Sequence, residues 1–188
     1  MWWHRHRNAA GRWARVATTL AAAGLLAGCF QPLYGEKSLT GGPGVRERMS
    51  SVDVGNIPAP NGTPEARLAV EVRNALIFDL TGGSGMNSPT HNLAVRLSTV
   101  RQQVIVDITT ARPQVSQYGI NATYTLTEIA TGKPVVTGQT FARVSYDNPG
   151  QAQRFANARG MRDAENRAAK VISDQITSRL ASYFTAGT

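Results

Sequence analysis

The chain has 188 residues, of which 41% are apolar and 17% charged, so its composition is that of a globular protein with one or two domains. The formal net charge of +8 is typical of proteins that bind nucleic acids or anionic surfaces. Four arginines and no acidic residue occur in the first fifteen residues, so the rest of the chain carries only +4. Half of the excess charge therefore belongs to the N-terminus, and the length excludes a large multidomain protein.

The first 28 residues have the layout of a secretory signal sequence. A basic stretch precedes an apolar run from Val16 to Leu26, which is shorter than the roughly 20 residues that a permanent membrane-spanning helix needs. The segment Leu26-Ala27-Gly28-Cys29 then resembles the lipobox of bacterial lipoproteins, in which the cysteine is lipidated at sulfur and becomes the new N-terminus. We therefore predict that residues 1–28 are removed and that Cys29 carries the lipid.

Cys29 is the only cysteine of the chain, which restricts the chemistry of the mature protein. No internal disulfide can form, and this holds equally for the alternative of an ordinary signal peptide followed by a free thiol. The lipoprotein resemblance implies three acyl chains, which exceed the two signals that stable membrane attachment requires. His4 and His6 lie in the segment to be removed, so His91 is the one histidine of the mature chain.

After the lipidated cysteine, the sequence predicts a tether over residues 29–48 and a single α+β domain over residues 49–185. The tether is rich in Gly and Pro, and the apolar alternation after it predicts a strand near residues 50–57. A helix should follow, because Thr63 is placed as its N-cap and Pro64 as its first residue. Gly82 and Gly83 should end this helix. Its apolar stripe is Leu68, Val72, Leu76 and Leu80.

A polar loop over Gly85–His91 separates this helix from the next predicted strand, which covers Leu93–Thr99. The denser apolar run Val104–Ile108 either extends that strand past a bulge or forms a separate strand beside it. Arg112-Pro113 is expected to break the run.

Two further strands should form a hairpin. Apolar residues alternate with Asn and Thr over Tyr118–Ile129, and Thr131-Gly132-Lys133-Pro134 supplies the turn. The returning strand covers Val136–Ser145, with Phe141 and Val144 on opposite faces, so that one of the two side chains is available to a partner.

The last element is a long helix that should begin at Pro149 and continue to about Phe184. Its apolar stripe is Met161, Ala164, Ala168, Ile172, Ile176, Leu180 and Phe184, and its solvated side is Arg162, Asp163, Glu165, Arg167 and Lys170. The sequence therefore predicts an α+β fold, a two-layer sandwich in the order β-α-β-β-β-α. Two helices should pack on a mostly antiparallel four-stranded sheet.

The residue types of the mature chain argue against catalysis. A nucleophile needs a neighbouring base, but His91 lies in a predicted loop and Cys29 is consumed by lipid. No cluster of His, Cys or carboxylates has metal-ligand spacing, and no cofactor motif occurs. Export and the absence of a basic motif interleaved with aromatic residues argue against a nucleic-acid partner. An anionic lipid fits better, since Arg and Lys bind phosphorylated headgroups through charge-assisted hydrogen bonds.

These features resemble the lipopolysaccharide-assembly lipoproteins, the LptE family, of an alphaproteobacterial type. The resemblance covers nearly the whole mature chain. Its carriers are Gly28-Cys29-Phe30-Gln31-Pro32-Leu33-Tyr34-Gly35, Val72-Arg73-Asn74-Ala75-Leu76, Tyr124-Thr125-Leu126 and Ser145-Tyr146-Asp147-Asn148-Pro149.

The resemblance implies a small two-layer sandwich anchored to the inner leaflet of the outer membrane, on the periplasmic side. Such a protein plugs and assembles a large β-barrel, an LptD-like subunit, and helps to deliver lipopolysaccharide outward. Family members bind lipopolysaccharide through a basic residue near the turn between the second and third strands, and through another shortly after the Asn-Pro helix start. The matching positions are Arg112 and Arg154, and the further candidates are Arg101, Lys133 and Arg143.

Two alternatives stay open from the sequence. One is a free periplasmic lipid-binding or transport-auxiliary lipoprotein that acts without a barrel partner, and the other is a small envelope hydrolase that depends on His91. Phe30 follows the lipidated cysteine in place of the Asp that is associated with inner-membrane retention in enterobacteria, which favours the outer membrane. Which face of the domain would contact a barrel is a question for the structure.

Overall fold

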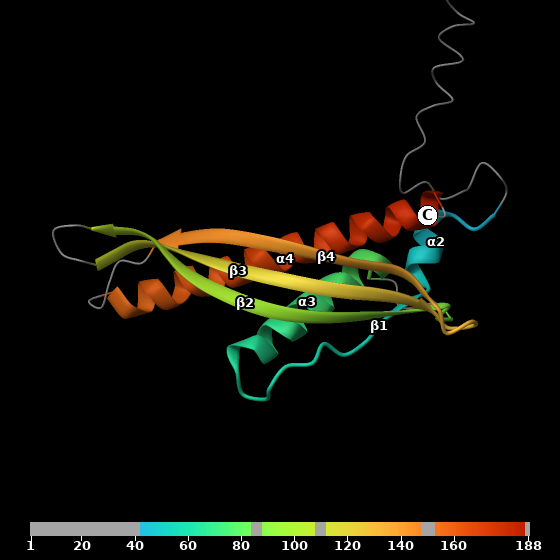
Figure 1. Cartoon of the computed structure of the whole chain (residues 1–188), viewed down its shortest axis with the longest axis horizontal. Helices are drawn as coiled ribbons and strands as arrows, with labels where there is room; N and C mark the ends of the chain where they lie inside the picture. The colour runs from blue at the N-terminus through green and yellow to red at the C-terminus, as the bar shows by residue number, and fades with distance from the viewer. Residues whose placement is uncertain (1–41, 84–87, 108–111, 148–152, 187–188) are drawn as a thin grey trace, which may run out of the picture.

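The computed structural model describes residues 42–83, 88–107, 112–147 and 153–186 (Figure 1). The predicted order of strand, helix, three strands and helix is confirmed. A short helix that the sequence did not predict, α2, stands before it. In chain order the elements are α2 (Val45–Ser50), β1 (Val52–Val54), α3 (Pro64–Thr81), β2 (His91–Asp107), β3 (Arg112–Glu128), β4 (Pro134–Asp147) and α4 (Arg154–Ala186).

The strands form one sheet in the order β1-β2-β3-β4. β1 runs parallel to β2, whereas β2, β3 and β4 are antiparallel to one another, so the sheet is mostly antiparallel as predicted. The register of β2 shifts between Gln103 and Ile105 and again between Ile105 and Val106. The apolar run after Val100 therefore extends the same strand past a bulge, which decides between the two alternatives.

Two expectations around the long strands were wrong. Arg112 and Pro113 do not break the strand but begin β3, where Pro113 pairs with Val106. A proline is tolerated there because the first residues of a strand can lack an N–H donor. His91 is not in a loop but begins β2, in register with Val52 and Glu128. Of the predicted loop Gly85–His91, residues 85–87 lie outside the described residues, as does the predicted helix start at residue 149.

Helices α3 and α4 lie on one side of the sheet (Figure 1). α4 packs against β3, β4 and α3, and α3 also contacts β1. The predicted stripe of α3 is buried, with each of its four leucine and valine side chains at most 2% exposed. The stripe of α4 is also buried, apart from half-buried Met161. From the sheet, the core receives Leu93, Val95, Tyr118, Ile120, Ala122, Tyr124, Leu126, Val136, Ala142 and Val144.

Helix α3 begins and ends at the predicted residues. The Thr63 hydroxyl accepts a hydrogen bond from the backbone N–H of Ala66 at 3.2 Å, and Pro64 is the first helical residue. Gly82 has a φ of 65°, in the left-handed region that favours glycine, and its N–H donates to the Phe78 carbonyl. These local signals set the first and last residues of the helix.

The antiparallel strands and α4 give the domain two distinct ends. The hairpin end comprises the last residues of β2, the first of β3, the last of β4 and the start of α4. The α2 end comprises α2, β1, the turn between β3 and β4 and the last turn of α4. Arg167 of α4 donates to the Ser145 carbonyl near the hairpin end, and Arg48 of α2 donates to the Phe184 carbonyl at the other. The 17 residues of β3 separate the ends by about 50 Å.

Candidate functional site

Two of the predicted lipopolysaccharide-binding positions lie at the hairpin end. Arg112 begins β3 opposite Asp107 of β2, and Arg154 begins α4 with its side chain exposed. Figure 1 shows the start of α4, the end of β2 and the start of β3 at the same end of the molecule. Residues 108–111, which join the two strands, lie outside the described residues.

An exposed aromatic residue accompanies this pair, and sequence reasoning missed it. Phe155, next to Arg154, is 88% exposed, and Val104 on β2 is 53% exposed. Its position in the sequence could have indicated the exposure. The apolar stripe of α4 recurs every three or four residues from Met161 onward, and Phe155, six residues earlier, does not belong to this series. A cation beside an exposed apolar side chain suits an amphiphile that carries both phosphate and hydrocarbon.

The other three candidate residues are not brought together with this pair. Arg101 lies on the helix-covered side of β2, with its guanidinium carbon 5.9 Å from the centroid of the Tyr118 ring. Arg143 lies on the opposite side of the sheet, 4.9 Å from the centroid of the Phe141 ring. Lys133 precedes β4 in the turn at the α2 end. These five basic residues therefore do not form one patch.

Among the described residues, no helix covers the side of the sheet away from α3 and α4, and we call this side the uncovered face. The prediction that Phe141 and Val144 lie on opposite faces is confirmed, because Phe141 is 58% exposed and Val144 only 8%. Phe141 therefore points away from the core on this face, next to Arg143. Strand register places Arg96, Ser98, Val100, Asn121, Thr123, Gln139, Phe141 and Arg143 together on it.

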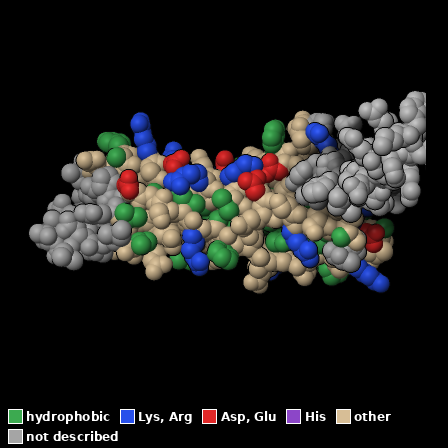
Figure 2. Space-filling view, turned by 90° about the horizontal axis from the view of Figure 1, so that it is seen from above, with side chains coloured by type: hydrophobic (Ala, Val, Ile, Leu, Met, Phe, Trp, Pro, Cys, Tyr) green, Lys and Arg blue, Asp and Glu red, His purple; other side chains and the backbone are tan. Residues whose placement is uncertain are grey.

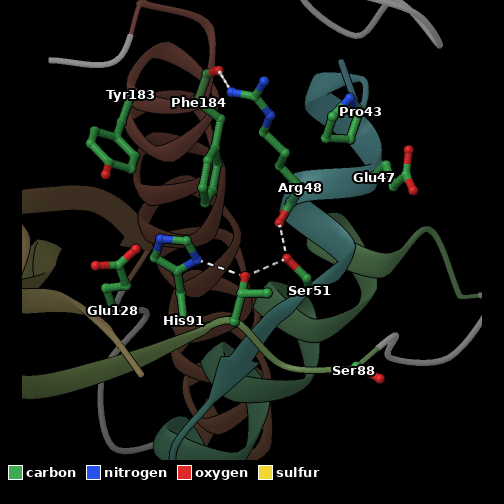
Figure 3. Close-up of a pocket in the computed structure, with 10 residues that line it drawn as sticks. Pro43, Glu47, Arg48, Ser51, Ser88, His91, Glu128, Tyr183 and Phe184 are labelled. Atoms are coloured by element: carbon green, nitrogen blue, oxygen red, sulfur yellow. Dashed lines mark hydrogen bonds between the residues drawn. The ribbon is translucent and has the colours of Figure 1, made fainter. Parts of the chain in front are cut away.

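The α2 end holds a cavity of about 660 Å³ (Figure 3). Its walls come from four elements that are far apart in the sequence. α2 supplies Glu47 and Arg48, β2 supplies His91, β3 supplies Glu128, and α4 supplies Tyr183 and Phe184. Sequence reasoning missed this cavity, because neither α2 nor the position of His91 was predicted.

The groups at the floor of the cavity are held by hydrogen bonds. The Thr90 hydroxyl lies 2.8 Å from His91 Nδ1 and 2.8 Å from the Ser51 hydroxyl, and Arg48 Nη1 donates to the Phe184 carbonyl at 3.1 Å. The His91 ring meets the Phe184 ring edge to face at 5.2 Å. Burial lowers the pKa of the His91 imidazole, and the charge of Glu128 partly opposes this shift.

One predicted solvent-facing residue is buried. Glu165 of α4 is 3% exposed, and its Oε2 accepts a hydrogen bond from Arg67 of α3. Its other oxygen, Oε1, is buried without a hydrogen-bond partner within the described ranges. Asp163, by contrast, is exposed as predicted and pairs with Arg167 one turn later. The periodicity of α4 alone could not distinguish these carboxylates, because the partner of Glu165 comes from another helix.

Charges are mixed over much of the surface. Figure 2 shows Lys and Arg side chains scattered over the visible face, several of them beside Asp or Glu. Lys170 illustrates this pattern, because its ammonium lies within 4 Å of both Asp79 and Asp174. The excess of positive charge is therefore not gathered into one patch on this face.

Two searches over the described part of the chain bear on function. No group of three or more His, Cys, Asp or Glu there could hold a metal ion. None of the helices in those ranges is long and apolar enough to cross a membrane.

Two helices on one face of a mostly antiparallel sheet define a small domain of the α+β sandwich class, with an exposed aromatic–cationic end and an uncovered polar face. The model of a family described as lipopolysaccharide-assembly, LptE, matches residues 49–180. The chain belongs to this family, whose members are non-enzymatic lipoproteins. No curated protein matches the sequence.

Three solved structures share the fold at low identity. A lipoprotein of Caulobacter crescentus is 19% identical, covers 77% of this chain and 97% of its own, and superposes with a TM-score of 0.60. Lipoprotein B of Nitrosomonas europaea is 15% identical, with 73% and 86% covered and a TM-score of 0.51. A minor lipoprotein of Acinetobacter baumannii is 14% identical, with 71% and 92% covered and a TM-score of 0.50. The alphaproteobacterial type is consistent with the Caulobacter relative.

Proposed function

We propose that this protein is an outer-membrane lipoprotein that plugs and assembles the lipopolysaccharide translocon barrel. In this role it binds lipopolysaccharide during transport to the outer leaflet, and it performs no catalysis of its own. The observation that carries the proposal is the family match over residues 49–180, which covers nearly all of the folded domain. The partners are a large LptD-like β-barrel and lipopolysaccharide.

The proposed anchor is the lipid on Cys29, which leaves the domain on the periplasmic side of the outer membrane. The lipobox sequence and the lipoproteins among the structural relatives support this placement. Residues 1–28 would be removed. The tether predicted over residues 29–48 is shorter than expected, because α2 begins at Val45, so residues 29–44 would lead from the lipid toward the domain.

The hairpin end is the proposed lipopolysaccharide-binding surface. Arg154 and Arg112 supply guanidinium groups for the phosphates of lipopolysaccharide, and Phe155 supplies an exposed apolar side chain for its acyl chains. Arg101, Arg143 and Lys133 lie on other surfaces, so we do not assign them to this site.

The uncovered face of the sheet is the proposed surface for the barrel. The lumen of an outer-membrane barrel is polar, and this face presents mostly hydroxyl and amide side chains to it. Phe141, 58% exposed and beside Arg143, is the best candidate for an apolar anchor within that contact, because exposed aromatic residues are enriched at interface centres.

The test is an affinity purification of the tagged full-length lipoprotein from detergent-solubilised envelopes, with bound proteins and lipids identified by mass. A large β-barrel recovered in stoichiometric amount supports the proposal, and Phe141→Glu should reduce its recovery. Bound lipid without any barrel would instead support the free periplasmic carrier. Mass analysis of the N-terminus, in the same sample, reports whether Cys29 is lipidated.

Charge-matched variants test the lipopolysaccharide surface. The pair Arg112→Glu with Arg154→Glu, and separately Phe155→Ser, should weaken lipopolysaccharide binding about tenfold or more, because charge-assisted contacts or apolar burial are lost. The control is Lys133→Glu with Arg46→Glu, which reverses the same number of charges at the α2 end, about 50 Å away, and should have little effect. If the arginine pair, Phe155→Ser and the control at the α2 end all lost lipopolysaccharide affinity equally, the assignment of this surface would be contradicted.

A further inference from the structure

The cavity at the α2 end carries charges of both signs, which distinguishes it from the hairpin end. Arg48 and His91 can meet an anionic group, whereas Glu47 and Glu128 can meet a cationic one. Tyr183 and Phe184 line the same space, and aromatic faces attract ammonium groups. In Figure 3, Arg48 and Glu47 project from α2 on one side of the cavity, and His91 and Glu128 lie on the other.

The groups for the anion are held in place by the fold. One guanidinium donor of Arg48 is used by the Phe184 carbonyl at 3.1 Å. A guanidinium has five N–H donors, so this bond fixes its position and leaves donors for a ligand. The Thr90 hydroxyl, 2.8 Å from Nδ1 of His91, similarly orients the imidazole and leaves Nε2 free of that contact. Positions fixed in advance reduce the entropy that binding must overcome.

The size of the cavity suits a small polar ligand. Its volume of about 660 Å³ falls in the middle of the roughly 300–1,000 Å³ that is usual for small-molecule sites. Each side of the cavity carries one group for an anion and one for a cation, so a ligand with one phosphate and one ammonium joined by a short linker can use groups from both sides.

The position of the cavity indicates the source of such a ligand. The described chain begins at Gly42, next to Pro43, which lines the cavity. Gly42 is 13 residues after Cys29. Even when fully extended, 13 residues reach only about 45 Å. A lipid on Cys29 therefore keeps this end of the domain close to a bilayer surface, where phospholipid headgroups are the most concentrated ligands.

We propose that the cavity between α2, the start of β2 and the end of α4 binds the headgroup of a zwitterionic phospholipid of the phosphoethanolamine class. Arg48 and His91 bind the phosphate, and Glu128, Glu47 and the aromatic side chains bind the ammonium. The choice of a membrane lipid as the source rests on the proposed anchor at Cys29. The site is distinct from the lipopolysaccharide surface, which lies at the opposite end.

The histidine count of the chain provides a direct assay. After removal of residues 1–28, His91 is the one histidine, so histidine-selective isotope labelling gives a single imidazole resonance inside the cavity. We would purify the processed lipoprotein in maltoside detergent and titrate it with glycerophosphoethanolamine, with the singly charged phosphodiester glycerophosphoglycerol, or with ethanolamine. The zwitterion should shift the His91 resonance saturably, and each single-charge probe should bind about tenfold more weakly, because one set of charged contacts is missing.

Matched variants locate the binding. Arg48→Gln and Glu128→Gln should each weaken the zwitterion about tenfold. Arg46→Gln is the control, because Arg46 is on the same helix and makes the same charge change, while its guanidinium lies beside Gly82 and outside the cavity. Circular dichroism and the melting temperature show that each variant is folded. Binding that is equal for glycerophosphoglycerol and the zwitterion, or unchanged in both cavity variants, would overturn the proposal. The absence of any shift would overturn it as well.

A second arm distinguishes a membrane lipid from a soluble compound. In nanodiscs that contain phosphatidylethanolamine, the anchored chain should show the His91 resonance at its bound position without added ligand. In discs of phosphatidylglycerol alone, the resonance should stay at its free position. If the soluble zwitterion binds while phosphatidylethanolamine discs leave the resonance at the free position, the lipid source is wrong. This readout needs no barrel, so its failure and that of the translocon proposal are separate results.

Discussion

The buried ion pair between α3 and α4 should respond very differently to removal of its two partners. Glu165 is 3% exposed and has one oxygen without a partner, whereas the Arg67 side chain is 38% exposed and also donates to Asn166. Removing Arg67 leaves a buried carboxylate with neither oxygen paired. Removing Glu165 leaves a guanidinium that can turn toward water.

The magnitudes follow from this asymmetry. Breaking a fully buried pair costs about 3–5 kcal/mol, and replacing a buried charge by an apolar side chain of similar size is often neutral or stabilising. Because water already screens part of the Arg67 side chain, we expect Arg67→Met to lower the free energy of unfolding by about 2–3 kcal/mol. Glu165→Met should change it by less than about 1 kcal/mol, and the double variant should resemble Glu165→Met.

Urea unfolding of the three variants at neutral pH measures these differences. In thermal unfolding, Arg67→Met should lower the melting temperature by roughly 5–10 °C for a domain of this size. Arg167→Ala is a suitable control, because its pair with Asp163 is exposed on both sides and should contribute less than about 1 kcal/mol. A loss for Glu165→Met as large as that for Arg67→Met would refute the reasoning that the unpaired carboxylate dominates.

Substitutions at three further positions test local features of the fold. Thr63→Ala removes the N-cap of α3 and should lower the free energy of unfolding, measured with urea, by about 1 kcal/mol. Thr63→Ser keeps the capping hydroxyl and should retain most of this stability. Gly138→Ala should lower the free energy of unfolding by about 1–3 kcal/mol, because the added Cβ would lie 2.5 Å from the Tyr124 hydroxyl oxygen. An unchanged free energy would mean that the Tyr124 ring moves aside freely. The pKa of His91 is lower in the folded chain than the usual value near 6.5, so the folded state binds fewer protons than the unfolded state as the pH falls. His91 should therefore destabilise the folded protein below about pH 6.5. His91→Gln should unfold with a weaker dependence on pH between 7 and 5, and an unchanged dependence would contradict the shift.

Features that depend on neighbouring residues in the sequence were predictable, and features that depend on distant partners were not. Thr63 and Gly82 act through their own backbone neighbours, so both ends of α3 were predicted correctly. Glu165 was misassigned because its burial depends on Arg67, 98 residues away. α2 is six residues long, too short for a periodic pattern, and Met49 holds it to the core through contacts that only the folded chain provides.

The same distinction holds for the candidate sites. The resemblance selected Arg112 and Arg154 individually, and the antiparallel topology brings their backbone positions to one end. The sequence could not separate Lys133 and Arg143 from that pair, because strand register decides which face and which end a side chain occupies. The cavity was hidden for a similar reason, since its walls come from four elements spread over most of the domain.

Helix α4 has a mechanical consequence for where this protein can work. Its 33 residues run from the hairpin end to the α2 end, a length of about 50 Å, and it packs along β4 and β3 for much of that distance. A single continuous helix resists bending, so the distance between the α2 end and the hairpin end is fixed. If Cys29 carries a lipid, as we propose, this length and the 13 residues that follow Cys29 set the maximum height above the bilayer at which Phe155 and Arg154 can meet a ligand, about 95 Å. Any partner that receives lipid from this surface must present its entrance within that radius.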